Sequence, residues 1–140
     1  MDFSFIKLPQ GIQMRKPYKN ELTYFEKNKN VAGMATEDDK VILNPYAKLK
    51  PDEFQAVAVN ESARLVMRQD QTMRPDFALT PEQIGFLDST TYKTANQLDR
   101  NSTIAARILS GDPSAGKPTQ EQSMFVEKLK QRLDISSESP

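Results

Sequence analysis

The segment 51–69 restricts the fold more than any other part of the chain, because its apolar residues occupy two sides of a helix. Pro51 suits the first position of a helix, and acidic groups at positions 52 and 53 favour the helix dipole. One side carries Phe54, Val57, Ala58 and Leu65, and the other carries Ala56, Val59, Ala63, Val66 and Met67. Since a helix with two apolar sides must be covered from both directions, the segment predicts a central helix.

Other segments have the start and stop signals of helices. Asn20 is a favourable N-cap for a helix that runs to about Asn28. Thr80 and Thr119 each precede a glutamine by three residues, a pattern in which the two side chains bond to each other's backbone N–H groups. These pairs predict a short helix from residue 81 and a last helix that ends near residue 133. A further helix is expected from about Leu98 to Ser110, with Gly111 as its C-cap.

Two short apolar runs, 34–36 and 41–43, flank the polar residues 37–40. This pattern predicts a small β-hairpin at about residues 34–43. Pro45 ends the second strand, because proline cannot donate a hydrogen bond to a strand ladder.

Residues 1–19 are expected to form an extended N-terminal arm, since two prolines and a glycine interrupt any long helix there. Four apolar side chains lie near its start, namely Phe3, Phe5, Ile6 and Leu8. An apolar segment of this kind must dock, because it is otherwise an aggregation liability. Extended segments commonly add a strand to a free sheet edge, and the hairpin offers such edges. We therefore predict that these four side chains contact a protein partner, with docking on the chain's own domain left open.

Together these elements predict a mainly α fold with a small β-hairpin, in which a compact bundle of about four to five helices follows an extended N-terminal arm. The length of 140 residues is typical of one domain. We expect the arm at 1–19, a single helical domain at 20–135 and a disordered tail at 136–140.

The composition excludes several classes of function. The chain has no cysteine and no histidine, so it lacks thiol nucleophiles, the commonest general base and the usual transition-metal ligands. Lysine plus arginine number 19, as do aspartate plus glutamate, whereas a nucleic-acid-binding protein normally carries a basic excess. No apolar run is long enough for a membrane helix. We expect no metal, no cofactor, no nucleic-acid partner and no membrane partner.

One loop resembles a phosphate-binding motif in part. Residues 111–117 match the pattern Gly-x-x-x-x-Gly-Lys. The next position, which requires a hydroxyl group for magnesium, is Pro118, and Pro113 removes a backbone amide from the cradle. The segment is interpreted as a loop between two helices.

Glu61, together with Arg68, falls within the first apolar side of the predicted central helix. A buried carboxylate requires a partner, because an isolated buried charge is costly. Arg64, Arg68 and Arg107 are the candidates, so we predict a structural ion pair among these residues and assign no catalytic residue.

The strand at 41–43, a short link and a helix with Asn60-Glu61-Ser62-Ala63-Arg64 resemble the core of zincin-type zinc metallopeptidases. In those enzymes a helix bears His-Glu-x-x-His, whose histidines hold zinc and whose glutamate activates water. Glu61 matches that glutamate, but Asn60 and Arg64 stand at the ligand positions and cannot replace imidazole. The resemblance implies a non-catalytic relative of that fold.

Three segments look like parts of small proteins encoded by tailed bacteriophages, often near virion genes: NESARLVMR (60–68), LTPEQ (79–83) and TIAARILSGDPS (103–114). The resemblance spans about residues 30–133, implies a phage setting and transfers no functional residue.

The first hypothesis for function is a non-enzymatic phage accessory or virion-associated protein that acts through protein–protein contacts, in the virion or in the host cytoplasm. Its partner would be another virion or phage protein, or a second copy of the chain in a homo-oligomer. A hydrolase-like enzyme that uses Glu61 and a host-directed inhibitor are the alternatives.

Overall fold

The structure is a computed structural model, and it describes residues 2–133. The tail expected at 136–140 lies outside the described residues. The chain divides into two compact units, an N-terminal unit that comprises residues up to Leu65 together with Leu133, and a second unit that comprises Val66–Arg132. Each is described by itself below, and the single domain expected over 20–135 stays a prediction.

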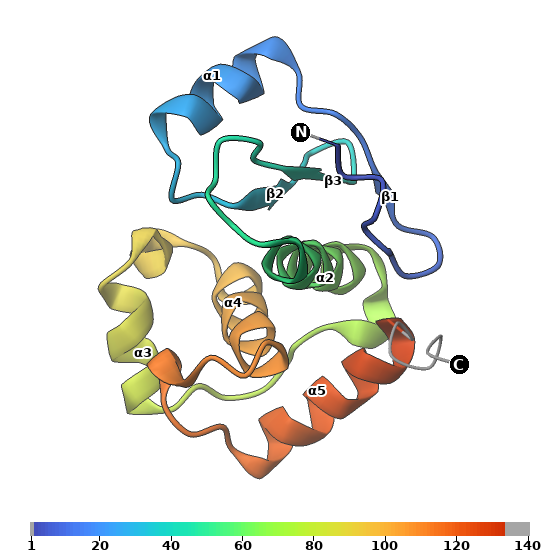
Figure 1. The fold of residues 1–140 in the computed structure, drawn as a ribbon. Coiled ribbons are helices and arrows are strands. Elements are labelled where there is room, and N and C mark those ends of the chain that lie inside the picture. Colours follow the sequence, from blue (N-terminus) through green and yellow to red (C-terminus); the bar gives the residue numbers. More distant parts are fainter. Residues whose placement is uncertain (1, 134–140) are drawn as a thin grey trace. The chain divides into compact units, whose positions relative to one another are not determined.

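The fold is mainly α with a small β part, as the sequence predicts (Figure 1). The elements of the described chain are β1 (Gln13–Met14), α1 (Lys19–Lys27), β2 (Gly33–Ala35), β3 (Lys40–Leu43), α2 (Pro51–Gln69), α3 (Pro81–Asp88), α4 (Gln97–Leu109) and α5 (Gln120–Leu133). Short 3-10 turns lie at Gln71–Met73, Thr91–Thr94 and Pro113–Ala115.

The predicted hairpin is present as β2 and β3, which pair antiparallel with Met34 opposite Ile42. The expected arm contributes a third strand, β1, which pairs parallel to the other edge of β3 with Met14 opposite Val41. β3 is therefore the central strand, and Figure 1 shows α1 and α2 on opposite sides of this sheet. Because both of its faces are covered, Val41, Ile42 and Leu43 are all buried.

α1 begins two residues earlier than the sequence predicts, with Tyr18 rather than Asn20 as its N-cap. The carboxylate of Glu21 accepts a hydrogen bond from the Tyr18 backbone N–H at 2.7 Å. This bond satisfies the backbone at the cap without a polar cap side chain, which is why a tyrosine can stand there. At the other end, the Asn28 side chain donates to the Tyr24 carbonyl at 2.8 Å.

The bounds of α2 agree with the sequence prediction. Phe54, Ala58 and Leu65 are buried on the first predicted side, and Ala63, Val66 and Met67 are buried on the second. Ala56 departs from the prediction, because it is exposed in the first turns of the helix. The second apolar side is thus covered only in the C-terminal half of α2.

Both predicted capping pairs of the second unit are present, at the starts of α3 and α5. Their glutamines, Gln83 and Gln122, also bond to each other, with Nε2-to-Oε1 distances of 2.7 and 2.8 Å. Both side chains are completely buried. The two helix starts are therefore joined through one reciprocal amide pair.

α4 is the most buried helix of the second unit, since six consecutive residues from Asn101 to Ala106 are buried. Asn101 donates to the carbonyls of Pro75 at 2.6 Å and Phe77 at 3.0 Å, and so fixes the connector that follows α2. Gly111 follows the C-cap residue Ser110 with a φ of 74°, a left-handed conformation that glycine adopts without strain.

Candidate functional site

Glu61 faces the sheet from the middle of α2. Its side chain is 15% exposed, and Oε1 lies 3.8 Å from Nε of Arg64. The carboxylate also accepts a backbone hydrogen bond from Ala35 of β2. Burial raises the pKa of Glu61, and Arg64 and the Ala35 N–H oppose that shift only in part. The geometry makes Glu61 an acceptor for the backbone of β2.

Arg107 and Arg68, the other two arginines proposed beside Glu61, belong to the second unit. Arg107 hydrogen-bonds the Asp112 carboxylate, and its guanidinium carbon lies 4.9 Å from the centre of the Phe86 ring. Arg68 is exposed in the last turn of α2.

In the loop at 111–117, the Asp112 side chain bonds to the backbone of the loop itself. The Asp112 carboxylate accepts from the Ser114 backbone N–H at 2.9 Å and also binds Arg107. An anionic side chain thus takes the backbone donor that a phosphate would need. The structure agrees here with the interpretation as an interhelical loop.

The N-terminal arm docks on its own chain. The Phe3 ring lies 4.9 Å from the Phe54 ring in an edge-on arrangement. The side-chain amide of Gln55 donates to the Lys7 carbonyl and accepts from the Lys7 N–H, both at 2.8 Å. Of the four arm residues predicted to bind a partner, Ile6 and Leu8 are half-buried, and Phe5 is 42% exposed.

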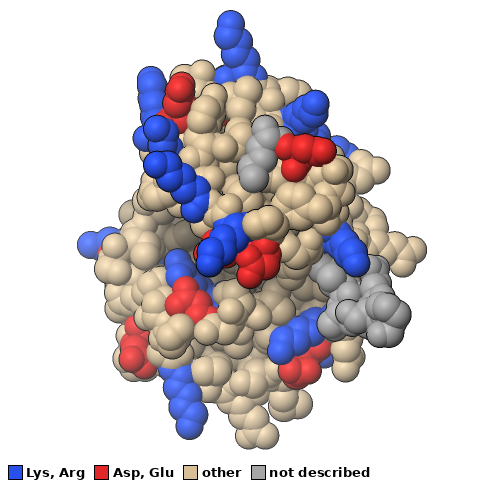
Figure 2. Space-filling view, viewed as in Figure 1, with Lys and Arg blue, Asp and Glu red and all other residues tan. Residues whose placement is uncertain are grey.

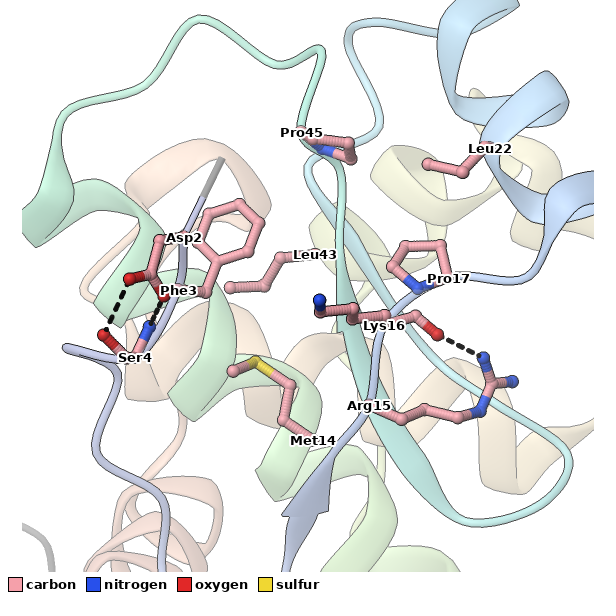
Figure 3. Close-up of a pocket in the computed structure, with 10 residues that line it drawn as sticks. All are labelled: Asp2, Phe3, Ser4, Met14, Arg15, Lys16, Pro17, Leu22, Leu43 and Pro45. Carbon is pink, nitrogen blue, oxygen red and sulfur yellow. Dashed lines mark hydrogen bonds between the residues drawn. The ribbon is translucent and has the colours of Figure 1, made fainter.

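The arm also forms one wall of a cavity of about 580 Å³ in the N-terminal unit (Figure 3). Apolar side chains line most of it, including Phe3, Met14 and Leu43. The Asp2 carboxylate in that wall accepts from the N–H and the hydroxyl of Ser4, which holds the start of the arm in a turn.

A second cavity of about 590 Å³ opens between α1, β2 and the hairpin turn, and it is the candidate functional site. We call it the tyrosine groove, because two tyrosines of α1 and its cap line it. Its lining residues are Arg15, Tyr18, Asn20, Glu21, Tyr24, Met34, Ala35, Thr36, Glu37 and Asp38.

Arg15 holds the tyrosine groove together. Its guanidinium donates to both carboxylate oxygens of Glu21, at 2.7 and 3.0 Å, and to both of Asp38, each at 3.1 Å. It therefore ties the residue after β1 to α1 and to the hairpin turn. Such two-pronged contacts are the geometry in which arginine binds carboxylates most strongly.

Arg15 holds two carboxylates of the groove in place, and the net charge of the groove lining is negative. Hydrogen bonds from Arg15 are the largest influence that holds the pKa values of Glu21 and Asp38 below their usual range. Both groups therefore stay ionised at neutral pH. With Glu37, the groove lining contains three carboxylates and one guanidinium.

The two tyrosines remain accessible beside these charges. Tyr18 is 57% exposed and Tyr24 is 46% exposed. The guanidinium carbon of Arg15 lies 3.8 Å from the centre of the Tyr18 ring, so this ring already makes one cation–π contact. Exposed aromatic rings beside a fixed charge network are typical of protein-binding surfaces.

No family model, curated protein or solved structure matches the chain. Among the described helices, none is long and apolar enough to cross a membrane. Within residues 2–133, no group of three or more acidic side chains is arranged to hold a metal ion. On the face drawn in Figure 2, positive and negative side chains are interspersed.

The sequence analysis does not predict the tyrosine groove. The sequence does not reveal that Arg15 binds both Glu21 and Asp38, because these two partners are separated along the chain. The third strand brings them together, and it was not predicted as a strand. The weak signal available was a single arginine just upstream of Pro17 and the first helix.

Proposed function

We propose that this protein is a non-enzymatic binding protein whose partner docks in the tyrosine groove. The observation that supports this most is the exposure of Tyr18 and Tyr24 beside a carboxylate network that Arg15 already holds in place. Preordered side chains lose little conformational freedom on binding, so such a surface favours association.

The setting proposed for this activity is a tailed bacteriophage, with a virion or phage protein as partner, and it rests on the resemblance of three segments. Co-purification of the protein with phage particles at a fixed copy number tests this setting. Its absence from particles and presence in the host cytoplasm would favour a host-directed inhibitor instead.

Site-specific crosslinking tests the groove itself. A photoreactive phenylalanine analogue placed at Tyr24 should give one discrete partner adduct in the cells that make the protein. The matched control is the same analogue at Tyr46, which is 37% exposed and does not line the groove. Equal adducts from both positions, or none from position 24, would contradict the proposal.

The hydrolase alternative has one supporting observation, the raised pKa of Glu61, since acids and bases with such shifts are common in active sites. Its carboxylate is already engaged by the Ala35 N–H, and the structure describes no second carboxylate in contact with it. A hydrolytic activity lost in Glu61→Gln, with unchanged stability, would replace the binding proposal.

A further inference from the structure

We infer that the tyrosine groove receives an arginine or lysine side chain from the partner protein, an inference that rests on the proposed function of the groove. The occupant is a basic segment of another protein, identified by the charge and the aromatic surface that would recognise it.

The first step is charge complementarity. Glu21 and Asp38 share Arg15 as their counter-ion, and Glu37 adds a third negative group to the same lining. Glu37 is exposed, and Asp38 keeps 48% of its side chain exposed even while it binds Arg15. An incoming cation therefore meets excess negative charge, whereas an acidic segment is repelled.

The second step is the aromatic surface. Arg15 stacks on Tyr18 at 3.8 Å, so the chain itself contains the guanidinium–tyrosine contact that the groove offers to a partner. Tyr24 lines the same groove from the next turns of α1 and keeps nearly half of its surface exposed. Cations bind favourably over such rings, and a nearby carboxylate adds to the attraction.

The third step excludes an added β-strand as the occupant. The outer edge of β2 is not open for strand addition at Ala35, because the N–H of that residue bonds to Glu61. Contacts in the groove must therefore come mainly from side chains. Among protein side chains, arginine and lysine are the ones that satisfy both an acidic rim and an aromatic wall.

The test measures binding of the full chain to three fluorescein-labelled peptides, Gly-Ser-Arg-Gly-Arg-Gly-Ser and its lysine and glutamate analogues, by fluorescence anisotropy. We expect the arginine and lysine peptides to bind and the glutamate peptide not to bind. Because rim charges are screened by salt, raising NaCl from about 50 to about 500 mM should weaken binding.

Substitutions in the tyrosine groove test whether the peptide binds there. Tyr24→Ala and Glu37→Gln should each weaken binding of the arginine peptide about two- to tenfold. The matched controls are Tyr46→Ala and Glu26→Gln, exposed residues of the same unit that do not line the groove, and they should leave binding unchanged. Circular dichroism shows whether each variant keeps its helices.

Failure to bind either basic peptide, or equal losses in the control variants, would overturn the inference. The proposed function fails separately, through the crosslinking experiment at position 24. A discrete adduct whose crosslinked partner segment lacks arginine and lysine would keep the binding function and reject the basic occupant.

Discussion

Arg15 organises the N-terminal unit at the scale of single residues. It follows directly after β1, and its guanidinium also donates to the Lys16 carbonyl at 3.1 Å. With both Glu21 and Asp38 bound, its donors join the end of β1 to α1, six residues along the chain, and to the hairpin turn, 23 residues along. One side chain therefore sets the position of α1 relative to the hairpin turn, and with it the shape of the groove.

Glu61 leads to a prediction about pH. Its pKa is raised in the folded protein, mainly by burial, so the folded state binds a proton that the unfolded state has already released. Stability therefore falls as the pH rises from the ordinary glutamate pKa through the raised one. Glu61→Gln removes this charge and keeps an acceptor for the Ala35 N–H. We expect its stability advantage over the natural protein to grow between about pH 4 and pH 8, as followed by urea denaturation.

Glu61→Ala is the matched comparison, because it removes both the charge and the acceptor. It should lower the free energy of unfolding by about 1–3 kcal/mol, the cost of leaving the N–H of the half-buried Ala35 without its acceptor. A natural protein that gains stability relative to Glu61→Gln as the pH rises would show that the ion pair with Arg64 outweighs burial.

At the scale of elements, local signals predicted the helices well. Pro51 and the two threonine–glutamine caps place the starts of α2, α3 and α5 where the structure has them, because these signals act within one turn of chain. The sequence does not predict strand β1, because two residues are too few to show the alternation of apolar and polar side chains that marks a strand. The pairing of β1 with β3 also depends on residues far along the chain. The reciprocal bonding of Gln83 and Gln122 was missed for the same reason.

The glutamine pair gives a prediction for the second unit. Gln122→Ala removes the partner of Gln83 and also leaves the Ala78 carbonyl without the donor that lies 2.9 Å away. Because these groups are buried, the free energy of unfolding should fall by about 2 kcal/mol. Gln131→Ala, at an exposed position of the same helix, is the control and should change it little.

A double-mutant cycle with Gln83→Ala isolates the contact between the two glutamines. Since either single substitution already breaks the pair, the double variant should cost less than the two single costs together. Additive costs would show that each glutamine acts only within its own helix cap.

At the scale of the whole molecule, the amino-acid composition restricts the chemistry of a functional site more than the sequence motifs do. The absence of histidine and cysteine excludes imidazole and thiol chemistry. In the near-miss motif at 60–64, Glu61 accepts from the Ala35 N–H of β2, and in the one at 111–117, Asp112 accepts from the Ser114 N–H. The groove itself could not be predicted, because it forms only when the arm, α1 and the hairpin turn come together in the N-terminal unit.

The arm gives the last prediction, and two truncations separate its roles. Deleting residues 2–8 removes the Phe3–Phe54 contact, the Gln55 clamp on Lys7 and a wall of the cavity, but keeps β1 and Arg15. Deleting residues 2–16 removes β1 and Arg15 as well. We expect the shorter deletion to lower the free energy of unfolding by about 1–3 kcal/mol, and the longer one to lower it more, because it also uncovers one edge of β3.

The substitution Phe5→Ser distinguishes docking from partner binding, since Phe5 is the most exposed of the four candidate residues of the arm. If the arm binds a partner or a second copy through Phe5, the substitution should leave the melting temperature nearly unchanged and reduce the mass measured by light scattering or the recovery in particles. If neither mass nor recovery changes, while deletion of residues 2–8 lowers the melting temperature, the arm acts only by covering α2 of its own chain. Partner binding would then rest on the tyrosine groove alone.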